Sequence, residues 1–191
     1  MRHISNFKKF FEDLSINLTD SPAIKVAKQN YNTDQLNLNE YKAKKDELTK
    51  IYTSTNPKDG SLLYDDTSIK AEVDKVLGKE DVNNGKDRNP FLSELLTILD
   101  LERRILIMQK SNLDDKLTLD DLKKETEDGG ENDQVTSKIK DINDRMSLNT
   151  SSIAKLQSDY TKSKKEFDDK MNNIVKDLQD NIKNITSQPK K

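Results

Sequence analysis

Few residues of this chain have the type and spacing that catalysis requires. The single histidine, His3, lies in the first turn, where little surrounds it to orient a general base or a metal ligand. Adjacent carboxylates occur at residues 114–115, 120–121 and 168–169. Because neighbouring residues on a helix point about 100° apart, the two members of a pair do not share a site.

Other chemical signatures are also missing. The chain has no cysteine, which excludes disulfides, thiol catalysis and cysteine-ligated zinc. The loop "EDVNNGKDRN" resembles a calcium loop in composition, but aligning Gly85 with the loop's glycine puts Glu80 and Val82 at the first and third ligand positions. No phosphate-binding loop or nucleophile elbow occurs. We therefore expect a protein that is not an enzyme, with no catalytic, metal or cofactor-binding residues and no cofactor.

The charge balance narrows the possible partners. The 33 basic residues nearly balance the 35 acidic ones, and 28 of the basic residues are lysines and five are arginines. Bidentate recognition of phosphates and bases favours arginine, so nucleic-acid binding is disfavoured. The longest unbroken apolar run, 105–108, is far too short for a membrane span, and the N-terminus lacks the apolar core of a signal peptide.

The composition also predicts the fold class. Charged residues make up 36% of the chain and hydrophobic residues only 31%, too few to fill the core of a globular domain of this length. Long helices that each bury one apolar stripe need less apolar material. We expect an all-α, elongated protein with a long C-terminal helix of the coiled-coil type.

The N-terminal residues 1–20 predict an amphipathic docking segment. Phe7, Phe10 and Phe11 gather on its apolar side, opposite lysines and acids. One interpretation is that this face binds the groove of a partner protein. The other is that it folds back onto the chain's own helices.

Residues 21–111 predict a helical region. Ser21 before Pro22 is typical of a helix start, while the asparagine-rich stretch 28–39 predicts an interrupted or kinked helix that becomes firmer from Leu38. Turn dipeptides break the chain at residues 53–61. A short helix should then begin at Thr67 or Ser68 and end at Gly78.

The stretch "NPFLSELLTILDLERRILIMQ" is the most apolar part of the chain. Asn89 and Pro90 predict the start of a helix over residues 90–110, which we term the hub helix. Its apolar residues cover more than half of its circumference, so it needs neighbours on at least two sides. Those neighbours are the earlier helices, the long helix or another chain, and the expected contact residues are Phe91, Leu95 and Leu99.

An acidic hinge is predicted over residues 112–134. Residues 113–133 carry nine acids and three lysines, and the Gly129-Gly130 pair should end any helix. No spacing of metal ligands is evident, which favours a solvated linker over a cation site.

Residues 135–191 predict one long amphipathic helix followed by a basic tail. Its apolar stripe advances in steps of three and four, shifts by one additional four-residue step near Lys164, and contains a single asparagine. That asparagine is interpreted either as a register-setting residue or as a tolerated polar defect. The stripe could pair with itself in a homo-oligomer, with the N-terminal helices or with another protein. Its residues are Ile139, Ile142, Met146, Asn149, Ile153, Leu156, Tyr160, Phe167, Met171, Ile174 and Leu178.

One resemblance adds to these patterns. The opening "MRHISNFKKFFEDL" resembles the short N-terminal segment found on assorted proteins of large tailed bacteriophages. The resemblance covers about fourteen residues and transfers no functional residue. It implies a virion or assembly protein, located in the virion or the host cytoplasm.

Together these features predict a non-enzymatic structural or assembly protein that bridges subunits of a larger complex, such as a capsid or tail. Two alternatives remain. A cytoplasmic adaptor would bind one partner helix through the stripe. A nucleic-acid-associated assembly factor would use the lysines of residues 162–191 and bind with a steep salt dependence.

Overall fold

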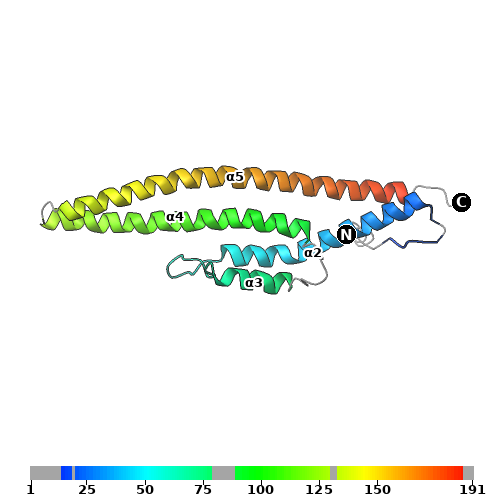
Figure 1. Cartoon of the computed structure of the whole chain (residues 1–191), viewed down its shortest axis with the longest axis horizontal. Coiled ribbons are helices and arrows are strands. Elements are labelled where there is room, and N and C mark those ends of the chain that lie inside the picture. The colour runs from blue at the N-terminus through cyan, green and yellow to red at the C-terminus, as the bar shows by residue number, and fades with distance from the viewer. Residues whose placement is uncertain (1–13, 19, 79–88, 130–132, 187–191) are drawn as a thin grey trace, which may run out of the picture. The chain divides into compact units, whose positions relative to one another are not determined.

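The computed structural model describes residues 14–18, 20–78, 89–129 and 133–186. These residues form four helices, with one isolated bridge between Thr55 and Leu62 and no strand among them (Figure 1). The all-α class and the long C-terminal helix are therefore confirmed. The helices are α2 (Pro22–Thr53), α3 (Ser68–Leu77), α4 (Pro90–Gly129) and α5 (Asp133–Thr186).

The chain divides into two compact units. Unit 1 contains residues 1–46, 81–94 and 165–191, and unit 2 contains residues 47–80 and 95–164. Both units combine segments that are distant in the sequence, whereas the boundaries expected from the sequence are consecutive. Helices α2, α4 and α5 each contribute residues to both units.

The structure confirms the two helix starts that the sequence predicts at Ser21-Pro22 and Asn89-Pro90. At α2, the Ser21 hydroxyl accepts a hydrogen bond from the backbone N–H of Ile24 at 3.3 Å. At α4, Oδ1 of Asn89 accepts from the N–H of Phe91 at 3.0 Å. In both cases a proline occupies the first helical position, where its missing N–H costs no hydrogen bond.

Asn89 also ties α4 to α2 within unit 1. Its Nδ2 donates to the carbonyl oxygen of Asn37 at 3.0 Å and to Glu40 Oε2 at 2.9 Å. Hydrogen bonds from Lys44 and from Asn89 lower the pKa of Glu40. One buried side chain thus starts a helix and fixes its position against a neighbour.

Replacing Asn89 by alanine is expected to lower the free energy of unfolding by about 2 kcal/mol, because the cap and two part-buried hydrogen bonds are lost together. Serine should retain the cap alone and recover about half of that loss, because its short side chain caps the helix without placing a charge beside Glu40. Urea denaturation followed by circular dichroism measures both variants. Equal losses in both would contradict the capping role.

Helix α2 differs from its prediction, because it is continuous through residues 28–39. The expected interruption was wrong. Polar side chains of this stretch are used in packing rather than in competing with the helix backbone: Gln35 is buried and donates to Asn39 Oδ1 at 3.0 Å. Tertiary contacts outweigh the low helix propensity of asparagine.

The connection from α2 to α3 is a tight turn followed by a capped helix. The N–H of Gly60 donates to the carbonyl of Asn56 at 2.8 Å, and Gly60 has φ 69°, a conformation that favours glycine. Asp65 Oδ1 accepts from the N–H groups of Thr67 and Ser68 at 3.0 and 2.7 Å. The hydrogen bonds around it, led by that from the Thr67 hydroxyl, lower the pKa of Asp65 to about 2. Helix α3 therefore begins at Ser68, one of the two predicted positions, and Asp65 supplies the side chain that caps it.

Helix α4 is almost twice as long as the hub helix that the sequence predicts. It continues from Pro90 through most of the expected acidic hinge and ends at Gly129. A high density of charged residues does not by itself prevent a helix from forming. Within the acidic segment, Leu119 is buried and Leu122 is half-buried, so the helix still has an apolar side to pack.

Candidate functional site

Unit 2 contains an antiparallel helix pair formed by residues 95–129 of α4 and 133–164 of α5 (Figure 1). Arg145 lies beside Asp115, and Asn112 Nδ2 donates to the Thr150 hydroxyl at 3.4 Å. These contacts show which residues of the two helices lie opposite one another. Because the helices run in opposite directions, counting about three turns forward from Arg145 on α5 and back from Asp115 on α4 brings Ile105 level with Leu156.

Shielded residues on both helices follow steps of three and four. The series on α4 is Ile105, Met108, Asn112, Asp115, Leu119, Leu122 and Thr126, and the series on α5 is Val135, Ile139, Ile142, Met146, Asn149, Ile153, Leu156 and Tyr160. The α5 set contains every stripe residue that the sequence predicted in this region. In unit 2 that stripe is therefore covered by the chain's own α4.

The middle of this helix pair contains a polar layer. Asn149 Nδ2 is 3.5 Å from the Ser111 hydroxyl, and Oδ1 of Asn112 is buried with no hydrogen-bond partner among the described residues. A buried amide that is only partly satisfied costs stability compared with an apolar residue. Such a layer favours the register that places Asn149 beside Ser111 and Asn112 beside Thr150.

Asp115 and Arg145 form an ion pair beside that layer. The guanidinium donates from Nε to Asp115 Oδ2 at 2.8 Å and from Nη2 to Oδ1, so the pairing is bidentate. Asp115 is buried, whereas Arg145 is about half exposed. The hydrogen bonds from Arg145 hold the pKa of Asp115 below its ordinary value, against the opposing effect of burial.

Replacing Arg145 by glutamine is expected to lower the free energy of unfolding only modestly at neutral pH, because the Arg145 side chain is about half exposed to solvent. Because the folded pKa of Asp115 lies below 3.8, its contribution is complete above that pH and is lost as the pH falls through the folded value. The difference between the two proteins should therefore shrink under acid conditions in a pH series of urea denaturations. A difference that stays constant down to pH values well below 3.8 would exclude this coupling.

Unit 1 has an aromatic cluster at its centre. The ring of Tyr41 lies edge-on to those of Phe167, at 5.6 Å between centroids, and Phe91, at 6.4 Å. Burial raises the pKa of the Tyr41 hydroxyl, and Asp168 and Asp46 act in the same direction. Lys170 lies over the Phe91 ring and forms an ion pair with Glu94. The cluster joins segments from α2, α4 and α5.

The remaining stripe residues of α5 lie in this unit. Within it, residues 22–46 of α2 run antiparallel to residues 165–186 of α5 (Figure 1). Counting in opposite directions from the contact between Tyr41 and Phe167 brings Tyr31 level with Leu178. Tyr31 and Leu178 are both buried. Met171 and Ile174, which lie between Phe167 and Leu178 on α5, are half-buried. This end of the stripe also has a partner within the chain.

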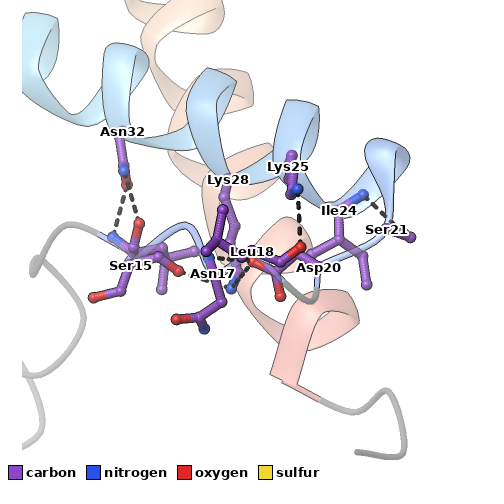
Figure 2. A network of polar contacts seen from close by, with 10 residues as sticks. Ser15, Asn17, Leu18, Asp20, Ser21, Ile24, Lys25, Lys28 and Asn32 are labelled. Atoms are coloured by element: carbon purple, nitrogen blue, oxygen red, sulfur yellow. Dashed lines mark hydrogen bonds and ion pairs between the residues drawn. The ribbon is translucent and has the colours of Figure 1, made fainter. Parts of the chain in front are cut away.

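Polar side chains of α2 hold the segment before it (Figure 2). Asn32 accepts from the N–H of Leu14 at 2.7 Å and donates to the carbonyl oxygen of Leu14 at 2.9 Å. Lys28 donates to the carbonyl of Ser15 and to Asp20 Oδ2, both at 2.8 Å. The described end of the predicted docking segment thus lies on the chain's own helix. The docking residues Phe7, Phe10 and Phe11 fall outside the described residues.

The hub helix has neighbours in both units. In unit 1, Phe91 contacts Tyr41 of α2. In unit 2, Leu95 and Leu99 are buried, and Arg103 reaches across to the carbonyl oxygen of Tyr64 and to Asp66 Oδ1 at 3.1 Å. The predicted contact residues of this helix therefore belong to the core of the chain.

Several structural residues were not identified from the sequence. Asn32, Asp115 and Arg103 make polar contacts with residues 18 to 39 positions away. Charged and amide side chains are abundant in the chain, so composition alone does not distinguish these three. For Asp115, the position on the shielded side of α4 was a usable signal, because it continues the steps from Ile105 and Met108.

The described residues contain no cluster of three or more histidine or acidic side chains that could hold a metal ion. None of the described helices combines the length and apolar character needed to cross a membrane. Comparisons with protein-family models, with curated proteins and with solved structures find no match to this chain.

Proposed function

We propose that this chain is a non-enzymatic structural protein that braces or bridges subunits of a larger assembly. The observation that carries the proposal is that the few apolar residues of the chain lie where its long helices pack against one another. Along α5, which has 54 residues, the apolar stripe is shielded by other helices of the same chain in both units. Apolar residues arranged in this way stiffen long helices, which is the requirement of a brace.

The pair of α4 and α5 in unit 2 is proposed to pack as an antiparallel coiled coil. Its support is the alternation of three- and four-residue steps among the shielded residues of both helices. Together with the bidentate contact between Asp115 and Arg145, such packing would hold the helices in one register. A stiff pair of this kind transmits force and maintains spacing between bound subunits.

A virion component is the more specific form of this proposal. It rests on the resemblance of the first fourteen residues to N-terminal segments of tailed-bacteriophage proteins. The docking segment would then attach the brace to its assembly through Phe7, Phe10 and Phe11.

Size fractionation of extracts from the source cells, followed by quantitative mass spectrometry, tests the structural role. We expect the chain to elute in a complex much larger than 21.9 kDa and at a constant ratio to the same proteins. Deleting residues 1–13 should release it from that complex while leaving its helical content unchanged. Elution as an isolated chain or dimer at every stage of growth would contradict the proposal.

A further inference from the structure

The exposed side of α5 carries a second regular pattern of residues in unit 2. Asp141, Asp144, Leu148, Ser151 and Lys155 follow the same alternation of three- and four-residue steps as the shielded stripe. All five are exposed, so they lie along one outward side of the helix. We term these five residues the outer stripe.

The outer stripe changes character along its length. It begins with two acids, has an uncharged centre and ends with a lysine. The centre lies within residues 146–154, "MSLNTSSIA", which contain no charge in a chain that is 36% charged. Leu148 at this centre is 70% exposed, the highest value among the large hydrophobic residues of the described helices. Small neighbours such as Ser147 and Ala154 would let another helix approach closely.

This order of charges is self-complementary. Rotating a second copy by 180° about an axis beside residues 149–150 places Asp144 opposite Lys155 of the second copy, and Leu148 opposite Ser151 of the second copy. Each pairing occurs twice, as in any two-fold symmetric interface. A parallel copy would instead place acid opposite acid and lysine opposite lysine. A uniformly acidic or basic partner would match only one end of the stripe.

We propose that a second copy of this chain docks antiparallel on the outer stripe. The apolar area is small, so the dimer is weak and weakens further as salt screens its charge pairs. The inference rests on the proposed structural function and names one of the partners that the brace connects.

Sedimentation equilibrium of the full chain at low ionic strength tests the interface by charge exchange. Asp144→Lys and Lys155→Asp should each raise the dimer dissociation constant about tenfold or more, because each variant places two pairs of like charges in contact. The double variant, with both changes, should return to within about threefold of the original value, because it restores opposite charges at both sites.

Asp120→Lys is the matched control, since Asp120 is an exposed acid on α4 outside the outer stripe. It should leave the dissociation constant unchanged, and circular dichroism should show equal helix content in all four variants. A double variant that stays as weak as the single ones overturns the inference. An original chain that remains monomeric at all concentrations also overturns it, and the proposed function survives that result if the chain still elutes with other proteins in a large complex.

Discussion

Replacing Phe167 by alanine is expected to lower the free energy of unfolding by about 3 to 5 kcal/mol. Phe167 is only 4% exposed, and its ring contacts Tyr41 at the centre of unit 1. The loss combines the transfer of a large apolar side chain to water with the cavity left between α2 and α5. Denaturant unfolding monitored by circular dichroism measures the effect.

The matched control for Phe167 is Leu36→Ala. Leu36 lies on α2 in the same unit but is 59% exposed, so its removal should change the free energy of unfolding by less than about 0.5 kcal/mol. Similar losses in the two variants would mean that the aromatic cluster does not form the core of this unit.

The second large effect is a gain in stability. Changing both Asn112 and Asn149 to leucine is expected to raise the free energy of unfolding by about 2 kcal/mol, because a partly satisfied polar layer is replaced by apolar contact. Asn149→Leu alone should give little gain, since it leaves the Asn112 amide beside an apolar side chain. Urea denaturation of the single and double variants measures this difference.

The same double variant should lose register specificity. With leucine at both positions, the α4–α5 pair contains fewer contacts that penalise a shift of one heptad. Cysteine pairs placed for the shifted register should then form disulfides that the original chain does not form. A strongly destabilised double variant would contradict the interpretation that the polar layer lowers stability and fixes the register.

The local features of the fold were accessible from the sequence. Capping residues act on the next few backbone N–H groups, so Ser21 and Asn89 could be recognised as helix starts. The shielded side of α5 followed directly from the spacing of its apolar residues.

The features that depend on distant contacts were not accessible. The asparagine-rich part of α2 is helical because residues such as Gln35 are buried against other segments, which propensity does not report. The acidic end of α4 is helical because Leu119 has a partner on α5. The sequence likewise left open whether the α5 stripe pairs within the chain or with another protein.

A disulfide trap tests the pairing of α4 with α5 within one chain most directly. The chain has no cysteine, so Leu119→Cys with Ile142→Cys introduces a single pair at positions that the register brings level. Leu119→Cys with Asn149→Cys, one heptad away, is the control. Under mild oxidation the first pair should form a disulfide within one chain, seen as a monomer of altered mobility, and the second should not. If the first pair forms disulfides only between chains, the α5 stripe is filled by another molecule and the account of the brace is wrong.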